Sequence, residues 1–206
     1  MPASPMFPLG NVLFPHGILP LHVFEPRYRS MMEECLADEG TFGVVLIERG
    51  SEVGGGDVRF DVGTLARIVQ AGRFDDGRYA VVTVGVQRVR VDEWLPDDPY
   101  PRAVVEVLDD ATVGDAPAHL EEVTRLLERV RALHVELGAP VGTDPVTLAV
   151  DDPVRASFEA AAMAPIGPLD AQALLEVDDA GERLERLVEL LTDEARALEF
   201  RLADDS

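Results

Sequence analysis

The stretch Met6–Tyr28, MFPLGNVLFPHGILPLHVFEPRY, decides how the first half of the chain folds. It is dense in apolar residues, but prolines interrupt it at four positions: Pro8, Pro15, Pro20 and Pro26. Proline fixes φ and has no N–H, so the stretch cannot form one continuous helix. We therefore predict two short strands, joined by a turn and followed by the start of a helix.

Side chains alternate in the second of these strands, Ile18–Phe24. Successive side chains of a strand point to opposite faces, so one set is predicted to face the core: Leu19, Leu21 and Val23. The other set is predicted to face outward: Ile18, Pro20, His22 and Phe24. Because Pro20 has no N–H, we expect this strand at the edge of a sheet.

Three blocks of the chain resemble the Lon protease substrate-binding domain family. The family's opening pattern, FPL…FP…LPL.VFE.RY, is similar to four short runs here: Phe7–Leu9, Phe14-Pro15, Leu19–Leu21 and Val23–Tyr28. Gly63–Ile68 resembles its GT.A.I strand, and Val84–Arg90 resembles its GxxRxRV strand. The resemblance implies a PUA-like, bulged β pseudo-barrel followed by a C-terminal α-helical bundle. It also implies that unfolded or exposed protein segments are recognised.

The hydrophobic period divides the chain near residue 110. Before this point a helix is predicted over Arg27–Asp38, and strands are predicted over Phe42–Glu48, Val58–Phe74 and Ala103–Leu108. Valines change parity near Gly85–Gln87, which predicts a β-bulge there. After it, helices are predicted over Leu120–Leu137, Pro145–Ala149, Pro153–Ala164, Asp170–Glu176 and Gly181–Phe200. We therefore predict an α+β chain with two domains, a β-rich barrel at 1–110 and a helical bundle at 111–206.

Charge and composition exclude several classes of function. The 206 residues carry 39 acidic and 18 basic side chains, a net charge of −21, which disfavours nucleic acid and anionic membranes as partners. The basic residues are all arginine. Without lysine, neither a Walker ATPase motif nor a Ser-Lys dyad can lie within these residues. Full-length Lon proteases carry both, so the resemblance implies a stand-alone substrate-binding portion that lacks the ATPase and protease modules.

We find no catalytic or metal-binding pattern. The four histidines have no ligand spacing, and no serine lies in a G-x-S-x-G motif, so we expect no cofactor, no metal and no enzyme activity. The single cysteine, Cys35, is predicted to be a small buried side chain. The chain begins without a signal-peptide pattern and has no membrane-spanning run, so we expect a cytoplasmic protein.

The remaining candidate is a surface that binds a peptide or a protein partner. Its predicted residues are Phe14, His16, Ile18, His22, Phe24, Arg27 and Tyr28. An aromatic patch beside an edge strand is suited to accept an extended peptide. The equally open alternative is that the helical bundle covers this patch. The predicted role is an adaptor or regulator in protein quality control, with a separate protease as a candidate partner. A small-molecule or RNA-binding pseudo-barrel and an unrecognised hydrolase are the alternatives.

Overall fold

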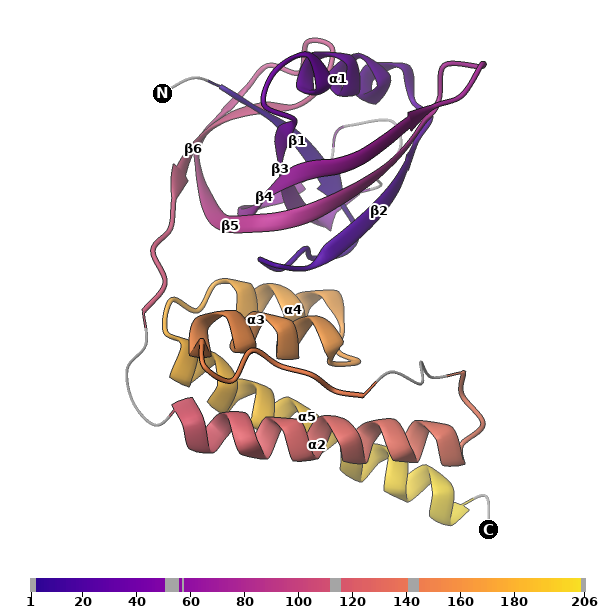
Figure 1. Cartoon of the computed structure of the whole chain (residues 1–206), viewed down its shortest axis with the longest axis vertical. Helices are drawn as coiled ribbons and strands as arrows, with labels where there is room; N and C mark the ends of the chain where they lie inside the picture. The colour runs from indigo at the N-terminus through magenta and orange to yellow at the C-terminus, as the bar shows by residue number, and fades with distance from the viewer. Residues whose placement is uncertain (1–2, 51–55, 57, 112–115, 141–144, 205–206) are drawn as a thin grey trace. The chain divides into compact units, whose positions relative to one another are not determined.

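The computed structural model describes residues 3–50, 56, 58–111, 116–140 and 145–204 of the chain (Figure 1). It divides into two compact units, Met1–Asp109 and Asp110–Ser206. The first unit holds a six-stranded sheet, and the second is built from helices, which confirms the predicted α+β class. None of the helices in the described ranges combines the length and the apolar composition needed to cross a membrane.

The first unit is a β-barrel of five strands, with a sixth strand, β2 (Ile18–Val23), paired to it on one side only. Its elements are β1 (Ser4–Leu9), β2 (Ile18–Val23), α1 (Pro26–Ala37), β3 (Thr41–Arg49), β4 (Val58–Arg73), β5 (Tyr79–Leu95) and β6 (Arg102–Val107). The sheet order is β2-β5-β4-β3-β1-β6, and a further pairing of β5 with β6 closes five of the strands into a ring. Strand β5 is long enough for its first half to pair with β2 and its second half with β6. Strand β2 therefore stands outside the ring, paired on one side.

A β-bulge turns β5 between these two pairings. Leu65 and Ala66 of β4 lie opposite Gln87 and Gly85, so Val86 is an extra residue on β5. The bulge lies where the change of valine parity predicts it. Glycine is required beside it, because a Cβ at Gly85 would lie 2.3 Å from the carbonyl oxygen of Phe14.

Two hydrophobic clusters lie on opposite faces of β1. Phe7 belongs to the larger cluster and its neighbour Met6 to the smaller one, as alternation along a strand requires. Helix α1 covers the larger cluster with a buried face at helical spacing: Tyr28, Met31, Met32 and Cys35. The rings of Phe7 and Tyr28 stack with their centroids 4.2 Å apart, so β1 and α1 are joined by an aromatic pair.

The second unit consists of α2 (Ala116–Glu136), α3 (Pro153–Met163), α4 (Pro168–Leu175) and α5 (Ala180–Asp204), with α2 and α5 packed along each other (Figure 1). The predicted helix at Pro145–Ala149 is wrong, because these residues are not helical. Instead, the Ala149 N–H donates to the Glu159 carboxylate at 2.8 Å, which fastens this short segment to α3. Five residues are too few for a helix to form without tertiary support.

Arg183 of α5 is fully buried and joins several parts of the second unit. Its guanidinium lies 2.9 Å from the Asp110 carboxylate and 2.6 Å from the Ser157 hydroxyl. It also donates to the Val177 carbonyl at 2.6 Å and lies over the ring of Phe158. One side chain thus connects α5 to α3, to the end of α4 and to the first residue of the unit.

A second buried arginine, Arg88, holds the end of the first unit. Its side chain donates to the Asp109 carbonyl at 3.0 Å, and its own carbonyl accepts from the Leu108 N–H at 3.1 Å. Adjacent residues of the connection, Asp109 and Asp110, are therefore held by different units. Asp109 is thus fixed by the first unit and Asp110 by the second.

Replacing Arg183 with methionine should lower the free energy of unfolding by about 3 kcal/mol, because Asp110 and the carbonyls of Leu174 and Val177 would lose a buried charged donor. Urea unfolding followed by circular dichroism measures this loss. The matched control is Arg186→Met on the same helix, whose pair with Glu182 is exposed. That change should stay within about 0.5 kcal/mol of the original protein. Equal effects of the two substitutions would contradict the role assigned to Arg183.

Candidate functional site

Beyond the short pairing of β1 with β6, the sheet is open between β1 and β2. Strand β1 pairs with β3 along Met6–Leu9, whereas β6 reaches only Ser4 and Pro5 on its other side. Strand β2 pairs with β5 alone, and no pairing joins β1 to β2 among the described strands. Each of the two edges contains a proline, Pro8 or Pro20, which has no N–H to donate to a neighbouring strand.

The backbone of β2 alternates between bonds to β5 and groups that face away from it. Gly85 of β5 donates to the Gly17 carbonyl at 2.9 Å and accepts from the His16 N–H at 2.8 Å, which fixes the phase of the pairing. In an antiparallel pair, alternate residues direct both backbone groups to the partner strand. In this phase the groups of Leu19, Leu21 and Val23 point to β5. The N–H groups of Ile18 and His22, and the carbonyls of Ile18, Pro20 and His22, point to the free edge.

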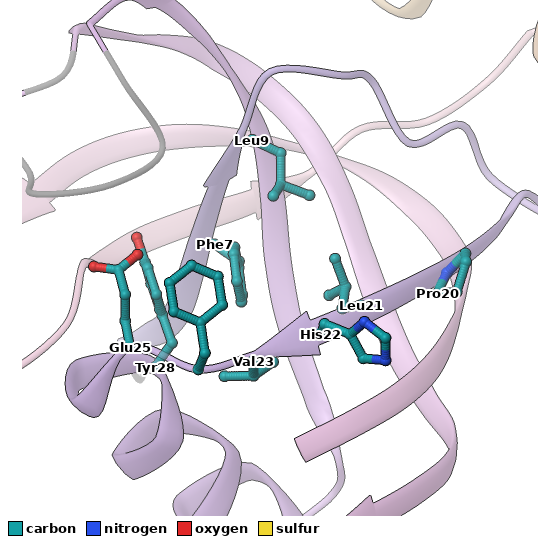
Figure 2. Close-up of a pocket in the computed structure, with 9 residues that line it drawn as sticks. Phe7, Leu9, Pro20, Leu21, His22, Val23, Glu25 and Tyr28 are labelled. Atoms are coloured by element: carbon teal, nitrogen blue, oxygen red, sulfur yellow. The ribbon is translucent and has the colours of Figure 1, made fainter. Parts of the chain in front are cut away.

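A cavity of about 200 Å³ lies along this opening. Figure 2 shows Phe7 and Leu9 of β1 directed toward Leu21 of β2 across the space between the strands. Pro20, His22, Val23 and Phe24 contribute the β2 side, and Glu25 and Tyr28 close the end at the start of α1. The walls are thus mainly apolar, and one of them is a strand edge with free backbone groups.

A second hollow, of about 480 Å³, shares three residues with the first: His22, Val23 and Phe24. Its other walls come from the turn between β4 and β5, where Phe74, Arg78 and Tyr79 lie. Phe74 is 48% exposed, so apolar surface continues from β2 toward this turn. Phe24, which is 56% exposed, lines both hollows.

The predicted outward set of β2 lies outward. Ile18, Pro20, His22 and Phe24 are exposed, whereas Leu19 and Leu21 pack against the larger cluster and Val23 is buried. The alternation predicted for this strand is therefore confirmed.

Two of the residues predicted for the binding surface, Phe14 and Tyr28, are buried rather than exposed. Phe14 is 4% exposed, because the loop before β2 is held against β4 and β5: the Leu13 carbonyl accepts from Thr64, and the Phe14 carbonyl lies beside Gly85. Tyr28 is 3% exposed, because its ring stacks on Phe7. Tyr28 still lines the cavity, as part of its wall.

Arg27 and His16 border the site in different ways. Arg27 is half-buried, with its Nε 3.1 Å from the Glu25 carboxylate and its guanidinium 4.5 Å from the centre of the Tyr28 ring. It therefore fixes the entrance of α1 beside the cavity. His16 is exposed and has a φ of 65°, so it shapes the turn before β2 through its backbone.

Sequence reasoning missed several residues that line the hollows. They are Phe7, Leu9, Leu21, Pro20, Val23, Glu25, Phe74, Arg78 and Tyr79. The first three are core residues by their pattern, and only the missing pairing between β1 and β2 brings them to an opening. The last three come from a hairpin turn about fifty residues further along the chain, which the pairing of β2 with β5 brings near.

The shifted pKa values near α1 belong to a packing cluster. Burial raises the pKa of Tyr100 to about 12, and the hydrogen bond that its hydroxyl donates to Glu34 acts in the same direction. Burial likewise raises the pKa of Cys35 to about 12, with the Glu34 charge adding to the effect. Arg102 pairs with Glu34 and donates to the Tyr100 hydroxyl at 2.8 Å. Both weak acids are protonated at neutral pH, so they serve as donors that hold α1.

An RNA-binding pseudo-barrel would need arginines gathered on one face of the sheet, but the four candidates Arg67, Arg73, Arg88 and Arg90 are dispersed. Arg88 is fully buried, and Arg73 pairs with Glu33 at 3.2 Å. Arg67 and Arg90 are exposed but lie in different parts of the sheet, opposite Val84 and Val62. Within the described ranges, no three acidic, histidine or cysteine side chains come together in a way that would hold a metal ion.

Comparison with known proteins gives consistent matches. The family model of the ATP-dependent protease La (LON) substrate-binding domain matches residues 3–193. The Lon protease of Anaeromyxobacter dehalogenans is 29% identical over 208 residues, which cover 98% of this chain and 24% of that protein. The Lon protease of Escherichia coli strain K12 is 28% identical over 200 residues, which cover 95% and 25%. The chain therefore spans about a quarter of the length of these curated relatives.

Two solved structures share the fold. The Lon N-terminal domain protein from Xanthomonas campestris has a TM-score of 0.67 and 26% identity, with 92% of this chain and 98% of that chain covered. The N-terminal domain of Mycobacterium avium complex Lon protease has a TM-score of 0.64 and 20% identity, with 93% and 99% covered. At that identity the second likeness supports the fold alone. Both agree with a mixed sheet followed by helices.

The raised pKa of Cys35 predicts a thiol that reacts slowly with thiol reagents. A pKa of about 12 in place of 9.0 lowers the thiolate fraction at neutral pH by about a thousandfold, and the S–H donates to the Thr41 carbonyl at 3.4 Å. Reaction with Ellman's reagent at about pH 8 should be at least about 100-fold slower in the folded protein than in guanidinium. Equally fast labelling in both conditions would show that Cys35 is accessible and that α1 does not pack as described.

Proposed function

The chain belongs to the Lon protease substrate-binding domain family, and from this premise we propose that it binds unfolded or exposed segments of other proteins without acting on them chemically. The observation that carries the proposal is the apolar opening between β1 and β2, where a strand edge with free backbone groups borders a cavity. A binding surface of this kind recognises extended chain through its backbone and through individual apolar side chains.

Exposed apolar side chains beside the opening favour this role. Ile18 is 72% exposed and Phe24 is 56% exposed, and both belong to the chain at or next to the free edge. Free strand edges with exposed apolar residues promote aggregation, so proteins usually protect them. Binding to another protein explains why a free strand edge and exposed apolar side chains occur together here. Packing within this unit does not explain it.

The chemistry of the described residues favours binding over hydrolysis. The two weak acids with strongly raised pKa values, Cys35 and Tyr100, are protonated at neutral pH and line neither hollow beside β2. A nucleophile needs the opposite change, a lowered pKa or an adjacent base. The alternative of RNA binding is disfavoured by the net charge of −21 and by the burial of Arg88.

We place the protein as an adaptor or regulator in protein quality control. The 206 residues contain no lysine, so a Walker motif or a Ser-Lys dyad would have to lie outside them. Any proteolysis of the captured segments is therefore assigned to other residues, with a separate protease as the proposed partner.

Replacing Phe24 with alanine should weaken the capture of unfolded protein by about tenfold, because exposed aromatic anchors supply much of the energy of such contacts. The probe is reduced and carbamidomethylated lysozyme, which cannot refold, and the measurement is fluorescence anisotropy of the labelled probe. The matched control is Phe200→Ala in α5, since Phe200 is 68% exposed and lies in the other unit. This control should change binding by less than about twofold.

The comparison with native lysozyme completes the test. The protein should bind the unfolded form and leave the native form free. Equal binding of the two forms, or no binding of either, would remove the proposed function. Equal losses in Phe24→Ala and Phe200→Ala would place the contact elsewhere on the molecule.

A further inference from the structure

We propose that the opening accepts a basic, extended segment of another protein, which adds to the free edge of β2 as a further strand. The inference rests on the proposed function and specifies two further properties of the captured segment, its backbone geometry and its charge. It is carried by the phase of the β2 backbone, by the size of the cavity and by the charge of the chain.

The backbone of β2 offers a set of groups that only an extended chain can use in full. The outward amides of Ile18 and His22 and the outward carbonyls of Ile18, Pro20 and His22 recur at every second residue. An added strand presents donors and acceptors at the same spacing. Since Pro20 lacks an N–H, its position supplies an acceptor only, and the segment needs no acceptor opposite it.

The cavity favours an extended segment over a helix. Its volume of about 200 Å³ admits individual side chains, whereas a helix with its side chains is about 10–12 Å across. The walls that face inward are apolar, with Leu9, Leu21 and Tyr28 among them, while Pro20 and His22 face outward. A segment with apolar residues at alternate positions would place those residues in the cavity and its polar residues in solvent.

Charge selects among the possible occupants. The unit that holds the opening, Met1–Asp109, carries 17 acidic and 10 basic residues, and its field attracts a basic segment and repels an acidic one. A second copy of the chain would carry the same net charge of −21, so pairing between two β2 edges is opposed by like charge. It would also place a proline in each edge, which removes donors from the new ladder. The favoured occupant is therefore a segment rich in arginine or lysine between its apolar residues.

The ligand arm of the test uses labelled peptides of about ten residues, one alternating leucine with arginine and one alternating leucine with glutamate. The leucine–arginine peptide should bind at least about tenfold more tightly at low salt, and added salt should narrow the difference. Two N-methylated forms of this peptide test the backbone. Methylation of the residues whose amides face β2 should weaken binding at least about tenfold, and methylation of the other set should not. If N-methylation of the arginine residues weakens binding, the segment adds antiparallel to β2. If N-methylation of the leucine residues weakens binding, the segment adds parallel to β2.

The protein arm compares two substitutions at the same residue. His22→Pro removes the amide that would donate to the segment, and His22→Ala removes the ring but keeps the amide. The leucine–arginine peptide should bind His22→Pro at least about tenfold more weakly than His22→Ala. Proline is already present two residues earlier in the same phase, at Pro20, so the fold should accept it. Circular dichroism and thermal unfolding of the full chain confirm that both variants fold.

The outcomes separate the two levels of the proposal. If unfolded lysozyme binds but the two methylated peptides behave alike, strand addition is overturned while the proposed function stands. Equal binding of the arginine and glutamate peptides overturns the assignment of a basic partner. If the chain dimerises and His22→Pro makes it monomeric, the occupant is a second copy and the inference is wrong. If neither unfolded lysozyme nor the peptides bind, the proposed function fails together with the inference.

Discussion

The missing pairing between β1 and β2 is the constraint on which the rest of the first unit depends. Each of these strands carries a proline, Pro8 or Pro20, whose absent N–H limits what can pair at its edge. The ring therefore closes elsewhere, through the second half of β5 and β6. Closing there requires β5 to turn, and the bulge at Val86 provides the turn. The apolar interior at the uncovered edge then becomes the wall of a cavity.

The sequence predicted local features well and long-range ones only in part. Alternation in Ile18–Phe24 and the parity change beside Gly85 are periodic signals within one strand, so both could be located from the residues alone. The burial of Phe14 could not, because it depends on a loop held against a distant strand. Phe74 joins the site through strand pairing, and Pro145–Ala149 is not helical and is bonded to Glu159 of α3. Neither feature follows from a local pattern, because each depends on a contact with another segment of the chain.

The charge of the chain and the protonation of its buried weak acids favour binding over catalysis. The strongly acidic composition gives the molecule a large net negative charge, which attracts basic partners at long range. The two weak acids with raised pKa values, Tyr100 and Cys35, hold α1 in place and are protonated at neutral pH. The opening beside β2 adds apolar walls and free backbone groups. Together these properties suit the recognition of extended chain, which presents both its backbone and its apolar side chains.

The most direct test of the open edge is amide hydrogen exchange of the isotopically labelled full chain, measured residue by residue by NMR. The amides of Leu19, Leu21 and Val23 should be protected by their bonds to β5, whereas those of Ile18 and His22 should exchange rapidly. Alternating protection along β2 would support the open barrel. Equal protection of Ile18 and His22 with their neighbours would show that the edge is already occupied, and it would contradict the account.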